Sequence, residues 1–407
     1  MRISRRGLLG TAAAATALPL VRARAQTPKI KIGVLTDLSG TYRDAVGPTS
    51  IICVKQAVEE FGSKGFDVEV ISADHQNKAD IGAAIARRWI DNEGVDAVAD
   101  VPTSSVALAV AQVTREKDKI MLNASATTMQ LTGTQCSPNT IVWSFDTYES
   151  GKSTGGAMVK AGGDSWFFIT ADYAFGHSLE EQTTAVVKKS GGKVLGALRY
   201  PFPDTTDFSS YIAQAQASGA KVLGLANAGA DSVNCIKQAN EFGLPQRGMK
   251  IAPLLIFISG VKAIGLQQAQ GLLLTETFYW DLNDRTRAFT KRVVPKTPNN
   301  WPNQAHASAY AVTLHYLKTV ADMGPAEAKK SGAATVARMK KMPSEDDAFG
   351  KGYIREDGRG VFPAYLFEVK KPAESKSDWD LYKLVATTPA EDAVRPLNEG
   401  GCPLVHV

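Results

Sequence analysis

From residue 29 onward, short apolar runs alternate with longer segments in which apolar residues recur every three or four positions. The first run spans residues 30–35, and one face of an expected helix is then lined by Ile51, Val54, Val58 and Phe61. Further strand-like runs lie at 68–71, 95–101 and 120–123, with helix-like segments between and after them at 81–89 and 106–113. Strands that alternate with amphipathic helices predict right-handed βαβ units around a parallel sheet that carries helices on both faces.

The same order of elements then starts again. Strand-like runs at 166–169, 194–199 and 222–226 alternate with helix-like segments that end at Lys189 and that span 208–217 and 232–242. Residues 68–117 and 195–243 share the order strand, polar loop, helix, strand, small-residue loop, helix. This internal similarity predicts two similar α/β lobes.

Beyond Gly271 the pattern does not build a third lobe. It predicts a strand at 272–279, a long helix at 305–322, a shorter helix at 334–341 and a hairpin made by 350–360 and 365–369. These pieces would complete the two sheets, so that the chain crosses between the lobes more than once, at hinge segments 144–148, 275–278 and 342–350. The expected division is 29–146 with 276–344 for the first lobe, 147–275 with 345–385 for the second, and 386–407 for a C-terminal tail.

Residues 1–25 have the composition of an export signal. The paired Arg5 and Arg6 precede an Ala- and Leu-rich stretch that continues to Val21, and a small-residue cleavage motif ends at Ala25. A membrane anchor is the competing interpretation, but the apolar core has only about 15 residues against the roughly 20 that span a bilayer. We therefore expect twin-arginine export to the periplasm, with cleavage after Ala25.

The formal charge of +5 belongs to this leader. Five of the 46 basic residues are leader arginines, and the 41 that remain equal the 41 acidic residues. The rest of the chain carries no basic run with interleaved aromatic residues, so we expect no nucleic-acid partner.

The four cysteines divide into two kinds. Cys53 and Cys235 fall in helix-like segments and are expected to be small buried side chains. Cys136 and Cys402 fall in loops that contain Gly and Pro, and an exported protein can form disulfides. We expect these two to pair and to hold the C-terminal tail, and none of the four has metal-ligand spacing.

The sequence contains no His-Glu-x-x-His, Walker A or Gly-x-Gly-x-x-Gly motif, and its five histidines are scattered. His75 follows Asp74 and could form an acid/base pair with it, although a polar loop beside a strand explains both residues equally well. We therefore expect neither enzymatic activity nor a cofactor.

Polar and small side chains follow the ends of several expected strands. The apolar run at 120–123 passes directly into Ala124, Ser125, Ala126 and Thr127. Comparable loops lie at 37–44, 103–105, 172–176 and 227–231. In open parallel sheets the carboxyl ends of the strands form the ligand crevice, although Ser and Thr are also ordinary loop residues.

Ser104 and Ser105 stand where the expected helix begins after the strand at 95–101. A helix N-terminus favours an anion, and a serine there can offer its hydroxyl together with backbone N–H groups. The alternative for each serine is a simple helix cap.

Over nearly all of the chain, from residues 31–40 (KIGVLTDLSG) to about Val369, these features resemble the periplasmic solute-binding proteins of ABC importers of the Leu/Ile/Val-binding type. The resemblance implies a type I periplasmic binding protein fold: two Rossmann-like lobes, a three-crossover hinge, and a ligand enclosed in the cleft. It also implies a monomer that hands its ligand to a permease in the inner membrane. A sensory module of the same fold is the rival interpretation.

By the same resemblance, the ligand carboxylate would be held by Ser104, Ser105, Ser125, Ala126 and Thr127. Phe175, just before a glycine, would pack on the ligand side chain with Tyr173 close by. The acidic residue that binds the ligand ammonium in the family would fall within residues 254–259, where Phe257 stands and no acid is present.

A family aromatic residue of the first loop is also replaced, by Val46, beside Tyr42 and Arg43. An ammonium without a partner is strongly disfavoured in a closed cleft. The sequence therefore predicts a carboxylate without an α-ammonium group, an aromatic or aliphatic acid, with Arg43 as a second anion contact. Asp231, in the loop that starts at Asn227, is the alternative ammonium partner and leaves branched-chain amino acids as candidates. We also expect Tyr42, Asn227 and Phe257 to contact the ligand.

Overall fold

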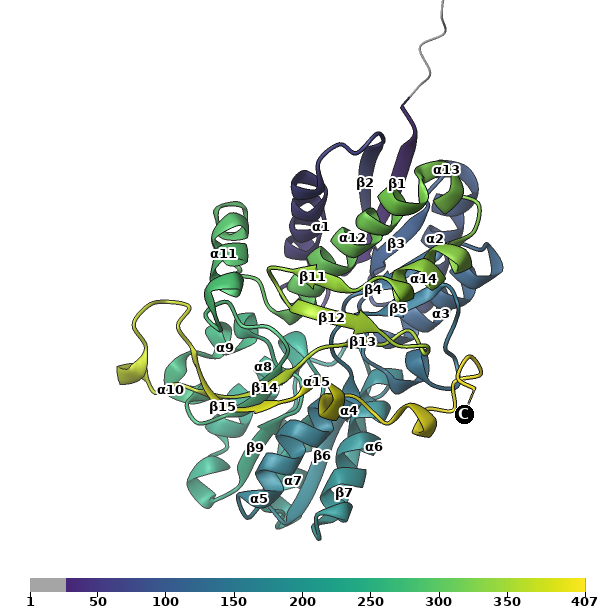
Figure 1. Cartoon of the computed structure of the whole chain (residues 1–407). Coiled ribbons are helices and arrows are strands. Elements are labelled where there is room, and N and C mark those ends of the chain that lie inside the picture. The colour runs from purple at the N-terminus through teal and green to yellow at the C-terminus, as the bar shows by residue number, and fades with distance from the viewer. Residues whose placement is uncertain (1–26, 407) are drawn as a thin grey trace, which may run out of the picture.

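The first lobe is built on a five-stranded parallel sheet in the computed structural model, which describes residues 27–406 (Figure 1). The expected export signal at 1–25 lies outside these residues. The strand order is β2-β1-β3-β4-β5, with every neighbouring pair parallel. The strands are β1 (Lys29–Thr36), β2 (Asp67–Asp74), β3 (Ala97–Asp100), β4 (Ile120–Asn123) and β5 (Thr140–Val142).

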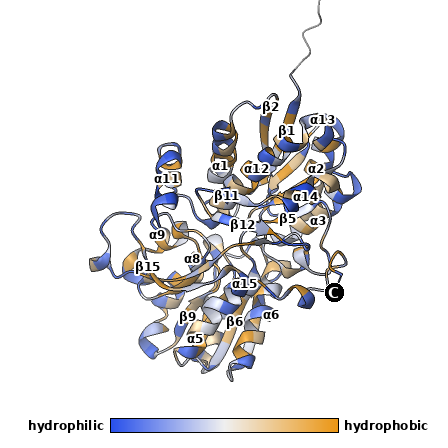
Figure 2. Cartoon of the chain, viewed as in Figure 1, coloured by the Kyte–Doolittle hydropathy of each residue, from blue (hydrophilic) through white to orange (hydrophobic). Residues whose placement is uncertain are grey.

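Helices cover both faces of this sheet because its strands are apolar on both sides. Trp89 and Val106 belong to one buried cluster, and Val54, Tyr310 and Val336 belong to another. The helices are α1 (Gly47–Phe61), α2 (Ala79–Glu93), α3 (Ser104–Glu116), α11 (Asp284–Val293), α12 (Gln304–Met323), α13 (Pro325–Ala328) and α14 (Gly332–Lys341). The peripheral α11 and α13 are largely hydrophilic in Figure 2, while the strands inside are apolar.

The second lobe repeats the arrangement with a four-stranded parallel sheet in the order β7-β6-β8-β9. Its strands are β6 (Ser165–Ala171), β7 (Lys193–Tyr200), β8 (Val222–Ala226) and β9 (Lys250–Pro253). Its helices are α4 (Thr147–Ser150), α5 (Gly156–Lys160), α6 (Ala174–Lys189), α7 (Ser209–Ala217), α8 (Gly229–Glu241), α9 (Ile258–Ile264) and α10 (Leu266–Ala269). The prediction of two α/β lobes with parallel sheets is confirmed.

Two small antiparallel sheets complete the fold, in the orders β10-β14-β15 and β11-β12-β13. Their strands are β10 (Leu273–Glu276), β11 (Ser344–Asp346), β12 (Gly350–Ile354), β13 (Gly360–Val361), β14 (Ala364–Val369) and β15 (Tyr382–Thr388). The expected hairpin between 350–360 and 365–369 is wrong. β12 pairs with β11 and β13, whereas β14 pairs with β10 and β15.

The segment from β11 to β13 packs with the first lobe. Ala348, Phe349, Ile354 and Phe362 lie in the same buried cluster as the first sheet, and a parallel bridge joins Val142 to Arg359. From Phe367 in β14 onward, the buried side chains belong to the hydrophobic core of the second lobe. The sequence predicts that residues from 345 onward belong to the second lobe. The buried contacts of Ala348 to Phe362 are with the first core instead, and the chain passes to the second core after β13.

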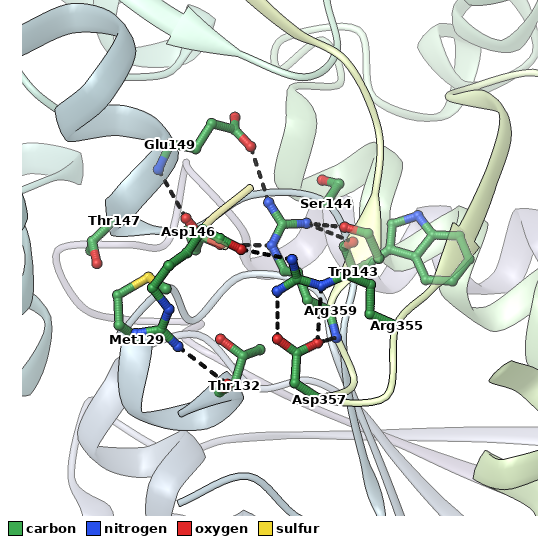
Figure 3. A network of polar contacts seen from close by, with 12 residues as sticks. Met129, Thr132, Trp143, Ser144, Asp146, Thr147, Glu149, Arg355, Asp357 and Arg359 are labelled. Carbon is green, nitrogen blue, oxygen red and sulfur yellow. Dashed lines mark hydrogen bonds and ion pairs between the residues drawn. The ribbon is translucent and has the colours of Figure 1, made fainter. Parts of the chain in front are cut away.

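Arg359 links two of the segments through which the chain passes from one lobe to the other, the segment at 143–149 and the segment around β13. Its side chain is buried and forms ion pairs with Asp146 (2.7 Å) and Glu149 (3.0 Å), which follow the first sheet (Figure 3). It also donates to the backbone carbonyls of Trp143 and Gly360. Burial raises the pKa of Glu149 well above its usual value. The network thus ties the start of the second lobe to the loop before β13.

A disulfide joins Cys136 to Cys402, as expected, with the two Cα atoms 5.6 Å apart. Cys53 and Cys235 are free and buried. The tail runs from β15 through α15 (Ala390–Ala393) to this bridge, and Arg395 donates to the carbonyl of Thr132 on the way. The C-terminal end is therefore fixed to the first lobe, although β15 belongs to a sheet in the second core.

Among the described residues, no helix combines the length and apolar character needed to cross a membrane.

Candidate functional site

The carboxyl ends of the two parallel sheets face each other across a pocket of about 350 Å³. Every lining residue follows one of six strands: β1, β3 and β4 in the first lobe, and β6, β8 and β9 in the second. The lining residues are Tyr42, Ala45, Val46, Pro102, Thr103, Ser104, Ser125, Ala126, Thr127, Tyr173, Phe175, Ala228, Leu255 and Phe257.

The loop between β3 and α3 has an unusual backbone. Asp100, Val101 and Thr103 have φ values of 73°, 54° and 69°, in the region that non-glycine residues rarely adopt. Such strain gathers at ligand-binding loops, where the surrounding structure must hold it. Here it directs the chain so that Ser104 begins a helix of 13 residues beside the pocket. The positive end of the α3 dipole therefore faces the pocket and favours an anion.

The loop after β4 is held by its own strand end. The side chain of Asn123 donates to the carbonyl of Ala126 (2.7 Å) and accepts from the backbone N–H of the same residue (2.9 Å). The hydroxyl of Ser104 accepts from the N–H of Thr128 (3.2 Å), which joins this loop to α3. Ser125, Ala126 and Thr127 consequently line the pocket beside Ser104.

Aromatic rings form the opposite wall and bridge the lobes. The hydroxyls of Tyr42 and Tyr173 are 2.6 Å apart, and Phe202 stacks on both rings, with centroid distances of 5.5 and 4.2 Å. Phe257 meets Phe145 edge to face at 6.1 Å. Burial raises the pKa of both tyrosines far above the usual value, so their hydroxyls stay protonated and can donate.

A second group of contacts closes the cleft beside the pocket. Thr41 Oγ1 donates to Asp231 Oδ1 (2.8 Å), and the N–H of Ala230 donates to the carbonyl of Thr41 (2.9 Å). Gly229, the residue before Ala230, has a φ of +60°. A Cβ atom at this position would lie 2.4 Å from the carbonyl oxygen of Thr41. The start of α8 therefore lies directly against the first-lobe loop.

The substitution Gly229→Ala is expected to weaken ligand binding about 10- to 100-fold, because the added methyl group collides with Thr41 only when the lobes are closed. Affinity can be measured by calorimetry with the tightest-binding acid. Gly191→Ala is the matched control: its φ is +82°, but its Cβ would meet nothing within 4 Å. Equal losses in both variants would mean that backbone strain, and not the closed interface, is responsible.

The structure brings eight of the sequence-predicted site residues together at the pocket. They are Tyr42, Ser104, Ser125, Ala126, Thr127, Tyr173, Phe175 and Phe257.

Four other predicted site residues do not line the pocket. Arg43 is exposed and pairs with Asp44 (2.7 Å), and Ser105, in the first turn of α3, is not among the lining residues. The amide of Asn227 is occupied by Ser232 and Cys235. The sequence predicts all four as ligand contacts.

The fourth of these residues, Asp231, has both carboxylate oxygens engaged. One accepts from Thr41 and the other from the hydroxyl of Tyr200 (2.7 Å). Burial raises the pKa of Asp231 to about 6. The suggested ammonium partner is therefore part of the contact between the lobes and does not face the pocket.

Six lining residues were not predicted as contacts: Ala45, Val46, Pro102, Thr103, Ala228 and Leu255. Their apolar or small side chains carry no chemical signal of their own. The only available signal was their position directly after strands of a parallel sheet.

The pocket wall carries no formal charge. None of its lining residues in the described part of the chain is Asp, Glu, Lys, Arg or His. No cluster of potential metal ligands occurs among the described residues either. The wall therefore offers neutral hydroxyls, backbone groups, a helix N-terminus and aromatic rings.

Comparison with known proteins places the chain in a family. The family model described as periplasmic binding protein matches residues 29–376. A periplasmic binding protein from Burkholderia mallei is 46% identical with a TM-score of 0.88, over 92% of this chain and 99% of that one. A branched chain amino acid ABC transporter periplasmic ligand-binding protein from Burkholderia xenovorans LB400 is 36% identical with a TM-score of 0.79, over the same shares.

More distant similarities agree with this fold. Leu/Ile/Val-binding protein homolog 6 of Brucella melitensis is 26% identical over 262 residues, which are 63% of this chain and 66% of that relative's own length. A solute binding protein from Rhodopseudomonas palustris, solved in complex with benzoate, is 20% identical with a TM-score of 0.80, over 92% of this chain and 99% of that one. At that identity the similarity shows the fold alone.

Proposed function

Since the chain belongs to the periplasmic binding proteins of ABC transporters, we propose that it captures a small carboxylate without an α-ammonium group and delivers it to an inner-membrane permease. Its family consists of substrate-binding proteins and not of enzymes. The role is therefore capture and release of a solute. The pocket wall determines which solute the protein can bind.

The observation that carries the proposal is the uncharged pocket wall. A carboxylate can be stabilised there by the hydroxyls of Ser104 and Thr127 and by the N-terminus of α3. An ammonium group would find no anionic partner on the same wall, and a buried unpaired charge costs several kcal/mol. The wall thus favours an acid over the corresponding amino acid.

The lining of the pocket favours a small ring or a branched aliphatic chain. The pocket lies between the two lobes and is lined mainly by apolar and aromatic side chains, as small-molecule sites are. Phe175, Phe257 and Leu255 provide apolar contacts for the body of the ligand. The benzoate complex of the Rhodopseudomonas protein is compatible with this class, whereas the Burkholderia xenovorans relative is named for branched-chain amino acids.

Ligand binding would act on the equilibrium between open and closed lobes. A ligand that contacts both lobes favours the closed form by no more than its difference in affinity for the two states. The contacts of Thr41 and Tyr42 with the second lobe already support closure. A permease could then recognise the closed form, in the periplasm that the proposed twin-arginine leader would reach.

A thermal-shift comparison of matched ligands tests this proposal. Leucine and 4-methylpentanoate differ only by the α-ammonium group, as do phenylalanine and 3-phenylpropanoate. We expect stabilisation by the acids, with benzoate included, and little or none by the amino acids. Strong stabilisation by leucine or phenylalanine with none by their partners would overturn the proposal.

A further inference from the structure

Asp100 is a buried acid directly behind the pocket wall, with no role in the contacts described so far. It is the last residue of β3 and is fully shielded from solvent. Ser125, which lines the pocket, donates its hydroxyl hydrogen to Oδ1 of Asp100. The other oxygen, Oδ2, makes no hydrogen bond of normal geometry among the described residues, although the hydroxyls of Thr36 and Ser50 approach the carboxyl. A buried carboxylate with an unsatisfied oxygen is costly, so its presence calls for an explanation.

The groups that face Asp100 supply no countercharge. Thr36 of β1, Ser50 of α1 and Ser125 of the β4 loop approach its carboxyl with hydroxyls. The titratable neighbour is Cys53 of α1, whose thiol pKa is raised by burial and by the charge of Asp100. Desolvation raises the pKa of Asp100 itself to about 6, because no cation compensates the ionised form.

The single hydrogen of Ser125 can be directed to only one acceptor at a time. While Asp100 is ionised, the hydroxyl donates to Asp100 and presents only lone pairs to the pocket. A carboxylate placed at Ser125 would then face those lone pairs with a second negative charge behind them. If Asp100 is neutral, its O–H can donate to Ser125, and Ser125 can donate to the ligand.

We propose that Asp100 takes up one proton when the carboxylate ligand binds, and that this proton turns Ser125 from an acceptor into a donor toward the ligand. The anion and the proton then enter the uncharged site together, so that its net charge is unchanged. Asp100 acts through Ser125 and is a positioning residue. The inference rests on the proposed function, because it requires a carboxylate at this site.

The expected signature is a coupling between affinity and pH. Above about pH 6, the affinity for an anionic ligand should fall about tenfold per pH unit, since each binding event consumes one proton. Benzoate and 4-methylpentanoate are suitable probes, because both are fully ionised in this range. Calorimetry at pH 7.5 in phosphate and in Tris gives the proton count directly, and we expect close to one proton per ligand.

Asp100→Asn should abolish the coupling, because an amide can donate to Ser125 permanently. We expect binding that is independent of pH between 6 and 8.5, no proton uptake, and an affinity at pH 8 at least equal to that of the unaltered protein. A variant that had merely lost structure would not bind more tightly at high pH. Thermal unfolding checks the fold, and the proton count of the unaltered protein is an independent measurement should the variant not fold.

Two further variants identify the proton acceptor. Asp346→Asn is the matched control: Asp346 in β11 is partly buried, desolvation also raises its pKa to about 6, and it does not line the pocket. It should keep the full proton uptake. Asp231→Asn tests the other acid near the cleft, and uptake that disappears there but survives in Asp100→Asn would overturn the proposal.

The outcomes separate this inference from the proposed function. Bound benzoate without proton uptake in the unaltered protein would overturn the role of Asp100 and leave the ligand class standing. Binding of leucine but of neither acid would overturn the ligand class. The number of protons taken up on leucine binding would then show whether the proposed protonation of Asp100 occurs, because leucine also carries a carboxylate.

Discussion

Replacing Arg359 with methionine is expected to lower the free energy of unfolding by about 3 to 5 kcal/mol. The change leaves Asp146 and Glu149 buried without the cation that both contact. It also removes donors from the carbonyls of Trp143 and Gly360. Methionine keeps most of the side-chain volume, so that the loss reports the charge and the hydrogen bonds. Urea denaturation followed by circular dichroism measures it.

The control for this prediction is an exposed ion pair of similar geometry. Arg338 pairs with Asp322 at 2.6 Å on the surface, so Arg338→Met should change the urea midpoint very little. Adding Asp146→Asn and Glu149→Gln to Arg359→Met should recover part of the loss, because both buried carboxylates are then neutral. A loss below about 1 kcal/mol for Arg359→Met would contradict its role in joining the two lobes.

The double substitution Ser104→Ala with Thr127→Ala is expected to weaken binding of the acid ligand by about 2 to 6 kcal/mol, at about 1 to 3 kcal/mol for each lost buried hydrogen bond. Both side chains are almost wholly buried, with 1% and 2% exposure, and both line the pocket. The bound carboxylate would lose two donors where no cation replaces them. Calorimetric titration with benzoate and 4-methylpentanoate measures the change.

Ser190→Ala with Thr387→Ala is the matched control, since both residues are exposed and lie outside the pocket. It should leave the affinity unchanged. Ser104 also accepts from the N–H of Thr128, so the melting temperature of the pocket variant has to be recorded as well. An unchanged affinity in a well-folded pocket variant would mean that the carboxylate binds elsewhere.

The local pattern of apolar and polar residues was sufficient to predict the two parallel sheets. Ile51, Val54 and Phe61 lie on one helical face, and they pack in the first core as their spacing predicts. Ser104 and Thr127 could be placed at the site because both follow strands of one parallel sheet, whose carboxyl ends meet at a shared edge. Pattern and topology together thus located most of the pocket.

The wrong predictions concern residues and strands whose contact partners could not be identified from the local sequence. Asp231 was a candidate ammonium contact, but its oxygens are taken by Thr41 and Tyr200, which lie 190 and 31 residues away. The strands β12 and β14 are both short, and no local feature of either tells which strand it will pair with. Asp100 gave no signal either, because its importance depends on complete burial behind Ser125.

The most direct test of the uncharged pocket is a pair of calorimetric titrations, one with leucine and one with 4-methylpentanoate, on protein freed of any bound solute by unfolding and refolding. The two compounds share carboxylate and side chain, so that the ratio of their dissociation constants isolates the α-ammonium group. We expect the acid to bind at least about 100-fold more tightly, because an unpaired buried ammonium costs several kcal/mol. Equal affinities, or tighter binding of leucine, would contradict the account.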